Sequence, residues 1–325
     1  MKKIRVAING FGRIGRAFFK LARENKEIEI VAINDLGSIE SMEYLLKYDT
    51  VYGKSEHNLK GVKYVSEKDP TKLPWRELDI DVVVESTGLF TSTEKSQAHI
   101  DAGAKRVVIT APIKDDGSPT VLMCMNEEKL KDCKISSNAS CTTNAGSPLI
   151  AILDETIGIE KALLNTVHAY TASQALVDGP SKKDVREGRA AAQNIVPSST
   201  GAAIAVTKVA TQLEGKFDGI SIRVPVPAGS IVDITFISKK NTTAEEVNGI
   251  LRKAAEDARW KGVFTVTEEE LVSHDIIGNQ HASIADLAFT RVVDGNLVKV
   301  LAWYDNEMGY THTLVRHVIE AGKLI

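Results

Sequence analysis

Three cysteines, Cys124, Cys133 and Cys141, are the side chains best suited to covalent chemistry in this chain of 325 residues. Cys141 stands in the segment SSNASCTTNAGSPL, between a predicted strand and a predicted helix that runs to about residue 156. The positive end of a helix stabilises a thiolate relative to a thiol, and small hydroxyl-bearing neighbours leave access to the sulfur. This segment favours a nucleophilic cysteine. The alternative is a small buried cysteine near a helix cap.

His168 ends the apolar predicted strand NTVHAYT. A single histidine among apolar residues is more often a hydrogen-bonded core residue than a catalyst. The combination with Cys141 changes this interpretation, because a neighbouring imidazole both activates a thiol and supplies a base. The hypothesis requires the sulfur of Cys141 and the imidazole of His168 to meet in the fold, beside the ring that accepts a hydride.

A glycine-rich turn, NGFGRIGR, places Gly10, Gly12 and Gly15 after the first predicted strand and at the start of a helix. Asp35 closes the second predicted strand, as in dinucleotide-binding folds, where such a carboxylate binds the ribose hydroxyls. Its charge opposes a 2′-phosphate and favours NAD over NADP, although Gly37 could leave room for a bulkier nucleotide. The alternative is a glycine-rich turn without a cofactor, in which Asp35 caps a helix.

The first part of the chain alternates continuous apolar runs with helical segments. The predicted strands span residues 4–9, 29–34, 80–86, 106–110 and 134–138. Such runs are typical of a parallel sheet covered on both faces. We therefore predict an α/β fold whose first part is a Rossmann-type, doubly wound parallel sheet domain.

The pattern changes after about residue 140, where the runs become longer and alternate between apolar and polar residues. The predicted strands there span 162–171, 219–227, 230–240 and 297–305, with helices near 201–213 and 243–258 and a loop over 171–193. This predicts an α+β catalytic domain with a largely antiparallel sheet. The expected domains are residues 1–140 for NAD and 141–305 for catalysis, with a C-terminal helix, 306–325, packing back on the first.

Composition narrows the classes of partner. A formal net charge of −3 and a pI near 6.2 give no electrostatic reason to expect nucleic acid or an anionic membrane. No apolar run approaches the roughly 20 residues that span a bilayer, and MKKIRVAINGFG lacks the features of a signal peptide. The cysteines are not arranged as C-x-x-C, so a structural metal site is not expected. These features predict a cytoplasmic protein.

Four blocks of the chain together resemble the phosphorylating glyceraldehyde-3-phosphate dehydrogenases. The blocks are NGFGRIGR with Asp35, SNASCTTN, HAYTASQALVDGPSKKDVREGRAAAQNIVPSSTGAA and WYDNE, and the resemblance covers essentially the whole chain. It implies that Cys141 is the nucleophile, that His168 is its base and that NAD accepts the hydride. The substrates would be glyceraldehyde 3-phosphate and inorganic phosphate, and the assembly a homotetramer with the 171–193 loop at subunit contacts.

The resemblance also assigns binding residues at matching positions. The implied NAD contacts are Arg13, Ile14, Asp35, Lys68, Thr110 and Asn306, with Asn306 at the nicotinamide carboxamide. The site for the substrate's C3 phosphate would contain Thr171 and Arg223. The remaining substrate and inorganic-phosphate contacts would be Ser140, Thr142, Arg189, Thr200 and Gly201. For either arginine taken alone, a surface salt bridge is the simpler interpretation.

The chain departs from the family's usual pattern at four positions: Ala145, Ile204, Met308 and Cys124. Ala145 stands four residues after Cys141, where most members have a second cysteine. We expect activity to be retained, and no disulfide to form at the site. None of the four departures falls on a residue with a chemical role.

Three other functions stay open. A homologous enzyme class acts on erythrose 4-phosphate by the same thiol chemistry, but the HAYTASQ and SSTGAA segments favour the triose. A binding or regulatory protein could keep the fold without turnover. An NADP-preferring or non-phosphorylating variant is the third alternative.

Overall fold

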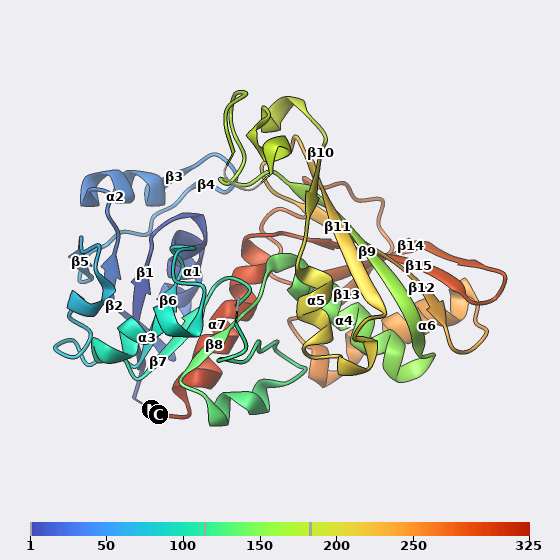
Figure 1. Ribbon diagram of the computed structural model, residues 1–325, viewed down its shortest axis with the longest axis horizontal. Helices are drawn as coiled ribbons and strands as arrows, with labels where there is room; N and C mark the ends of the chain where they lie inside the picture. The colour runs from blue at the N-terminus through green and yellow to red at the C-terminus, as the bar shows by residue number, and fades with distance from the viewer. Residues whose placement is uncertain (1, 114, 182–183) are drawn as a thin grey trace. The chain divides into compact units, whose positions relative to one another are not determined.

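The computed structural model describes residues 2–113, 115–181 and 184–325. Residues 182–183 of the predicted 171–193 loop lie outside the described residues. The chain divides into two compact units, Met1–Ser140 with Thr311–Ile325 (unit 1) and Cys141–Tyr310 (unit 2). Figure 1 shows unit 1 mostly in blue to cyan and unit 2 in green to orange.

Unit 1 contains a parallel six-stranded sheet in the order β5-β2-β1-β6-β7-β8. Its strands are β1 (Ile4–Asn9), β2 (Ile28–Asn34), β5 (Lys63–Val65), β6 (Val82–Glu85), β7 (Arg106–Ile109) and β8 (Ile135–Ser137). The order reverses between β1 and β6, which is the strand order of dinucleotide-binding folds. The predicted doubly wound parallel sheet is confirmed.

Helices and short elements connect these strands. The helices are α1 (Arg13–Glu24), α2 (Ile39–Lys47), α3 (Thr93–Asp101) and the end of α7 (Met308–Gly322), with 3-10 turns η1 (Pro70–Lys72) and η2 (Glu127–Asp132) and a small hairpin, β3 (Tyr48–Asp49) and β4 (Gly53–Lys54). A buried cluster that includes Trp75, Val83 and Ile109 packs on the sheet. This core fixes the ends of the strands, where a ligand site is expected.

Unit 2 contains a seven-stranded mixed sheet in the order β10-β11-β9-β12-β15-β14-β13. Its strands are β9 (Ile159–Ala169), β10 (Val196–Ser199), β11 (Phe217–Val224), β12 (Ser230–Ser238), β13 (Phe264–Thr267), β14 (Ser283–Val293) and β15 (Leu297–Tyr304). Most neighbours are antiparallel, but β11 pairs with β9 and β13 with β14 in parallel. The predicted largely antiparallel sheet is confirmed.

The two faces of this sheet differ. Helices α4 (Cys141–Thr156), α5 (Ala202–Thr207) and α6 (Ala244–Glu256) contact its strands (Figure 1). The 3-10 turns are η3 (Val185–Gly188), η4 (Ala191–Gln193), η5 (Thr211–Leu213) and η6 (Ala258–Trp260). Along β9, Leu164, Thr166 and His168 are buried whereas Leu163 is 66% exposed, as the period of two in a strand requires.

Two local expectations were wrong. The helix predicted over 201–213 is two short pieces, α5 and η5. The hydroxyl of Thr207 donates to the carbonyl of Ile204 at 2.8 Å, a side-chain bond that competes with continued helix. Strand β14 was not predicted, and its pairing register with β15 shifts between Asp286 and Arg291.

No helix among the described residues combines the length and the apolar character needed to cross a bilayer.

Candidate active site

The glycine turn of unit 1 requires glycine at two of its three positions. Gly10 has a φ of 93°, and a Cβ there would lie 2.7 Å from the backbone nitrogen of Thr87. A Cβ on Gly15 would collide with the carbonyl oxygen of Gly10. The turn is therefore packed between β1, α1 and the end of β6, as the sequence predicted for a close helix–strand approach.

Gly12 is the N-cap of α1 and provides no side chain to cap the helix. The first turn of α1 contains no acidic residue. Uncapped N–H groups and the positive end of the helix dipole suit an anion such as a pyrophosphate. A Cβ on Gly12 would meet nothing within 4 Å, so the backbone there is open to a ligand.

Asp35 lies one residue beyond β2, where two backbone groups hold its carboxylate. The N–H of Phe11 donates to Oδ2 at 2.7 Å, and the N–H of Gly37 donates to Oδ1 at 2.9 Å. A carboxylate offers about four acceptor positions. Two of them thus orient Asp35, and the other two can accept bonds from a pair of ribose hydroxyls.

These residues surround a cavity of about 390 Å³. It is lined by Asn9, Gly10, Gly12, Asn34, Asp35, Leu36, Glu67, Lys68, Pro70, Leu73, Ser86, Thr87, Leu89 and Phe90. Four of the predicted NAD contacts, Gly10, Gly12, Asp35 and Lys68, are thus brought together. The volume and the mixed lining are those of a small-molecule site.

Four predicted NAD contacts of unit 1 do not line this cavity: Gly15, which packs against the carbonyl of Gly10, and Arg13, Thr110 and Ile14. Arg13 forms an ion pair with Asp49, with 3.2 Å between Nη1 and Oδ2. Thr110 donates its backbone N–H to the carbonyl of Glu85 at 3.0 Å. Ile14 is half-buried in the first turn of α1.

A buried polar network below the cavity was missed by sequence reasoning. Glu85 accepts bonds from the side chains of Asn9 at 2.6 Å, Thr87 at 2.5 Å and His99 at 3.0 Å, and from the N–H of Thr87 at 2.8 Å. The indole N–H of Trp75 donates to Nδ1 of His99, so Nε2 of His99 carries the proton that Glu85 accepts. All four acceptor positions of this buried carboxylate are used.

In unit 2, Cys141 is the first residue of α4. Ala139, two residues earlier, has a φ of 56°, in the left-handed region that tight turns use. The hydroxyl-bearing neighbours Thr142 and Thr143 are buried, whereas Cys141 is partly accessible. The tight turn therefore leaves the thiol as the reactive group at the start of the helix.

The structure brings Cys141 and His168 together. Sγ of Cys141 lies 3.3 Å from Nε2 of His168. On the other side of the ring, Nδ1 lies 2.6 Å from the carbonyl oxygen of Ala169. We assign the proton to Nδ1, because the carbonyl can only accept, and this leaves Nε2 to accept the proton of the thiol.

Arg223 completes this group. It pairs with His168 across the parallel strands β11 and β9, with Nη1 2.5 Å from Nδ1 of the imidazole and 3.3 Å from the carbonyl oxygen of Ala169. The guanidinium therefore lies beside the imidazole and donates to the same carbonyl of Ala169 that Nδ1 faces. Nε of Arg223 is buried without a hydrogen-bond partner among the described residues. An anion beside Arg223 would give this buried donor a partner.

Burial sets the charge of the Cys141–His168 pair. It raises the pKa of the Cys141 thiol, against the opposing effects of Arg223 and of hydrogen bonds from Thr142. Burial, followed by the nearby charge of Arg223, lowers the pKa of His168 to about 3. Both shifts favour the neutral thiol and the neutral imidazole, and they oppose the effect of the helix end, which favours a thiolate.

Tyr304 supports the pair, and sequence reasoning did not single it out although it lies in the WYDNE block. Its hydroxyl bonds the hydroxyls of Thr142 at 2.9 Å and Thr166 at 2.8 Å. Its ring meets that of His168 edge to face, with centroids 5.9 Å apart. Burial raises the pKa of Tyr304, so it stays a neutral donor. It therefore fixes the residue after Cys141 and the position of the imidazole.

Asn306 is buried near the end of β15. Its Oδ1 accepts bonds from the N–H of Gly229 at 3.1 Å and from the hydroxyl of Ser230 at 3.0 Å. The same serine oxygen accepts the N–H of Ala169 at 3.1 Å. With its oxygen engaged, the amide NH₂ of Asn306 is the group suited to bind a carbonyl oxygen such as that of a carboxamide.

Two predicted phosphate contacts bond within their own loop. The hydroxyl of Thr171 bonds that of Ser173 at 3.0 Å. Arg189 is exposed, and its Nε donates to Oδ2 of Asp178 at 2.8 Å. Neither of these contacts joins Thr171 or Arg189 to the Cys141 pair.

The other predicted contacts flank helix starts. Ser140 precedes Cys141 directly, and Gly201 is the N-cap of α5. The hydroxyl of Thr200 accepts the N–H of Ala202 at 3.2 Å. Thr200 and Gly201 therefore form the start of α5, whereas Cys141 is the first residue of a different helix, α4.

The chain matches two family models. The model for the glyceraldehyde 3-phosphate dehydrogenase NAD binding domain matches residues 4–93, and the model for the C-terminal domain of the same enzymes matches residues 140–306. Together they span more than half of the chain. The chain belongs to the glyceraldehyde-3-phosphate dehydrogenase family. The cavity residues Gly10, Asp35 and Lys68 fall within the first match, and Cys141 and His168 within the second.

Curated relatives of the glyceraldehyde-3-phosphate dehydrogenase family match over nearly their full length. A glyceraldehyde-3-phosphate dehydrogenase of Streptomyces coelicolor is 46% identical, covering 98% of this chain and 98% of its own. One of Borreliella burgdorferi is 48% identical over 96% of this chain and 98% of its own. Glyceraldehyde-3-phosphate dehydrogenase 2 of Bacillus subtilis is 45% identical over 97% of both.

The departures from the family pattern have visible settings. Ala145 is fully buried in α4, and the three cysteines are free thiols. Cys124 has a φ of 73°, in the left-handed region that favours glycine, so a cysteine at this position strains the backbone. Ile204 is exposed on α5, and Met308 is the first residue of α7.

Proposed function

We propose that this protein is an NAD-dependent, phosphorylating glyceraldehyde-3-phosphate dehydrogenase. It would oxidise glyceraldehyde 3-phosphate to 1,3-bisphosphoglycerate through a thioester on Cys141, in glycolysis and gluconeogenesis. The observation that carries the proposal is the 3.3 Å contact between Sγ of Cys141 and Nε2 of His168, with Arg223 beside the imidazole. Two family models and relatives near 45% identity support the same activity.

The residues of unit 1 fit NAD. The helix end at Gly12 suits the pyrophosphate, and the acceptor positions left on Asp35 suit the adenosine ribose. The amide of Asn306 would bind the nicotinamide carboxamide. NAD, when bound, supplies the acceptor for the hydride that leaves the substrate carbon.

The chain's own groups provide the first step. The thiol proton of Cys141 passes to Nε2 of His168 as the sulfur adds to the aldehyde carbon, and the imidazolium returns it to the new oxygen. The product is a neutral hemithioacetal. Burial lowers the pKa of His168, so the imidazole is neutral at neutral pH and its Nε2 can accept a proton.

His168 acts again in the oxidation. Nε2 removes the hydroxyl proton of the hemithioacetal as the hydride leaves the same carbon, which gives a thioester and an imidazolium. Inorganic phosphate then attacks the thioester carbon, the sulfur leaves as thiolate, and His168 returns the proton to it. The backbone N–H of Cys141 at the helix start suits the oxyanion that forms in each addition.

The two phosphates would bind at separate arginines. Arg223, with its unpaired buried Nε, suits the C3 phosphate of the substrate together with Thr171. Arg189 would bind inorganic phosphate with Thr200 and Gly201, exchanging its bond to Asp178 for the anion. Guanidinium groups bind phosphate oxygens in pairs, which fixes orientation as well as charge.

The test is a spectrophotometric assay of NADH formation with and without inorganic phosphate. We expect sustained turnover with glyceraldehyde 3-phosphate only when phosphate or arsenate is present. Erythrose 4-phosphate, the four-carbon alternative, should give a lower kcat/KM. Equal rates without phosphate would indicate a non-phosphorylating enzyme, and no NADH with either aldehyde would contradict the proposal.

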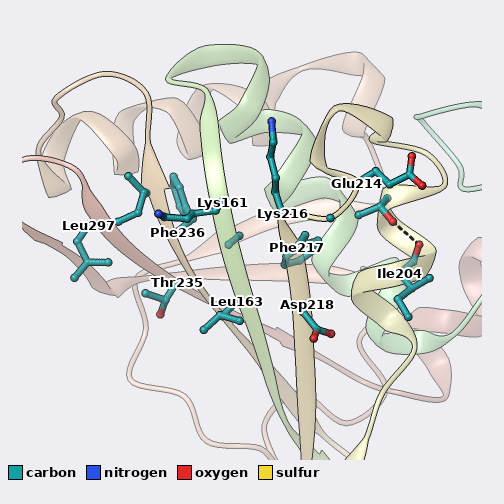
Figure 2. A pocket seen from close by; sticks show the side chains of 14 residues that line it. Lys161, Leu163, Ile204, Glu214, Lys216, Phe217, Asp218, Thr235, Phe236 and Leu297 are labelled. Atoms are coloured by element: carbon teal, nitrogen blue, oxygen red, sulfur yellow. Dashed lines mark hydrogen bonds between the residues drawn. The ribbon is translucent and has the colours of Figure 1, made fainter.

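We also propose that the protein is a homotetramer. The open face of the unit 2 sheet has a surface pocket of about 760 Å³ where Leu163, Ile204 and Leu297 are exposed (Figure 2). Side chains of both charges, such as Lys216 and Asp218, border it, as a self-complementary interface requires. Light scattering on the purified protein should give the mass of four chains, and a monomer would contradict the proposal.

A cytoplasmic location goes with this reaction. NAD and glyceraldehyde 3-phosphate are charged metabolites of the cytoplasm, where the enzyme would meet both. Fractionation of cells that express the protein should recover phosphate-dependent activity with the cytoplasmic fraction. Recovery with another fraction would contradict this assignment.

A further inference from the structure

The loop that carries Asp35 is held on both sides of Gly37. It runs from the end of β2 to Ser38, the N-cap of α2, whose hydroxyl accepts the N–H of Ser41. The peptide before Gly37 is held by its N–H bond to Oδ1 of Asp35. The peptide after Gly37 is held by its carbonyl, which accepts the hydroxyl of Tyr64 at 2.7 Å. A glycine, the residue with the freest backbone, is thereby fixed.

Tyr64 is well placed to act on this loop. It lies on β5, the edge strand of the unit 1 sheet, and pairs in register with Ile33 of β2, two residues before Asp35. Its side chain is half-buried. Tyr64 therefore links the ribose-binding loop to the rigid sheet through one hydrogen bond.

The charges around Tyr64 point the same way. Burial, followed by the nearby carboxylates of Asp35 and Glu40, raises the pKa of Tyr64 to about 12. The hydroxyl thus remains a donor at every pH at which the protein works. Two carboxylates at this corner also oppose a 2′-phosphate, which carries about −1.5 to −2 charges at neutral pH.

The space beside Gly37 is a second constraint, in addition to charge. A Cβ on Gly37 would collide with Cε of Met42 and lie 3.3 Å from Oδ1 of Asp35. The space beside the glycine is therefore filled by the flexible end of the Met42 side chain and bordered by the carboxylate of Asp35. A bulkier ribose substituent would have to displace the methionine and would meet this carboxylate.

We propose that Tyr64 is a specificity-determining residue for the cofactor. By holding the carbonyl of Gly37, its hydroxyl keeps the loop closed and Asp35 facing the ribose, so that a nucleotide with a 2′-phosphate is rejected. This inference rests on the proposed function only for the identity of the cofactor.

The test measures binding directly, by calorimetric titration of the full-length protein and of Tyr64→Phe with NAD and with NADP. Loss of one hydrogen bond should weaken NAD binding about three- to tenfold. Binding of NADP should stay the same or tighten, so the ratio of the NADP and NAD dissociation constants falls at least threefold. At saturating NAD, kcat should not change, whereas KM for NAD rises with Kd.

Tyr44→Phe is the matched control, because Tyr44 is an exposed tyrosine on the adjacent helix α2. It should leave both dissociation constants unchanged. The inference is overturned if Tyr64→Phe keeps the wild-type ratio, if Tyr44→Phe lowers it equally, or if kcat and the melting temperature fall together. Wild-type protein that binds NAD but does not turn over would contradict the proposed function alone.

Discussion

The two units hold their buried charges in opposite ways. In unit 1, the carboxylate of Glu85 accepts four hydrogen bonds, and Asp35 is oriented by two backbone N–H groups. In unit 2, Nε of Arg223 is buried without a hydrogen-bond partner among the described residues. A buried polar group without a partner costs about 1–3 kcal/mol, so the second arrangement is the more costly one.

This difference indicates that unit 1 is built for binding and unit 2 for the chemical step. The unit 1 cavity is preorganised before a ligand arrives, so less conformational entropy is lost on binding. In unit 2 the buried Nε of Arg223 still lacks a partner among the described residues, so a substrate phosphate that binds there would also satisfy this donor. Substitutions in unit 1 should therefore change affinity, and those in unit 2 should change turnover.

The largest expected effect comes from Cys141→Ser. A serine hydroxyl is a far weaker nucleophile than a thiol, so turnover should fall by a factor on the order of 10³ or more. The dissociation constant for NAD should stay within twofold, because the unit 1 cavity does not depend on the thiol. Phosphate-dependent NADH formation and calorimetry measure the two effects. Retained turnover would show that another group carries the chemistry.

Much of the unit 1 site was predictable because its requirements are local. Gly10 and Gly15 are dictated by backbone crowding within one turn, and Asp35 follows a short predicted strand. Such features depend on residues close in sequence, and they recur with fixed spacing. The parallel sheet itself followed from continuous apolar runs, and the predicted doubly wound parallel sheet is confirmed.

The unit 2 site was less predictable because strand register decides it. Arg223 meets His168 only because β11 pairs with β9 in parallel, at a register that no local pattern encodes. Tyr304 reaches Thr142 and Thr166 across more than a hundred residues. Cys141 and His168 were singled out from their local segments, and the resemblance to a family then implied their roles. That the two side chains meet in the fold was a separate, spatial hypothesis.

The second-largest effect is expected from Arg223→Gln, which tests the role of the charged group in unit 2. Removing a charge-assisted contact to the substrate phosphate should lower kcat/KM by about 10- to 100-fold. Loss of the positive charge should also raise the pKa of His168 above about 3, because Arg223 contributes to lowering it. The acid side of the kcat/KM profile should therefore move to higher pH. An unchanged profile would contradict the assignment of Arg223 beside the imidazole.

A third prediction uses one buried histidine in each unit, His317 in unit 1 and His168 in unit 2. In unit 1, Nε2 of His317 accepts the hydroxyl of Ser136 at 2.8 Å and Nδ1 donates to Asn138 at 3.1 Å. Burial lowers the pKa of His317 to about 3, as it does for His168. The unfolded chain binds a proton near pH 6.5. The contribution of these two neutral histidines to the free energy of unfolding should therefore be fully present above that pH. It should decrease as the pH falls toward 3.

Within this range, each histidine should lower the free energy of unfolding by about 1.4 kcal/mol for every pH unit of acidification. The loss between pH 6.5 and 5 is about 2 kcal/mol per histidine. His317→Asn should reduce the pH slope of the unfolding free energy, measured by urea titration, by one proton. His168→Asn is the matched variant in unit 2 and should do the same. A slope unchanged in both variants would show that neither imidazole is held neutral by burial.

The smallest effect is expected at Asp35, where the ligand makes hydrogen bonds but no bond is broken. Asp35→Ala removes the acceptor of the ribose hydroxyls and should weaken NAD binding about tenfold. It also removes a charge that opposes a 2′-phosphate, so the preference for NAD should relax. Asp35→Asn separates the two causes, because it keeps an acceptor but loses the charge. If Asp35→Asn restores NAD affinity but still admits NADP, charge sets specificity and hydrogen bonding sets affinity. A wild-type protein that already uses NADP as well as NAD would refute this account of Asp35.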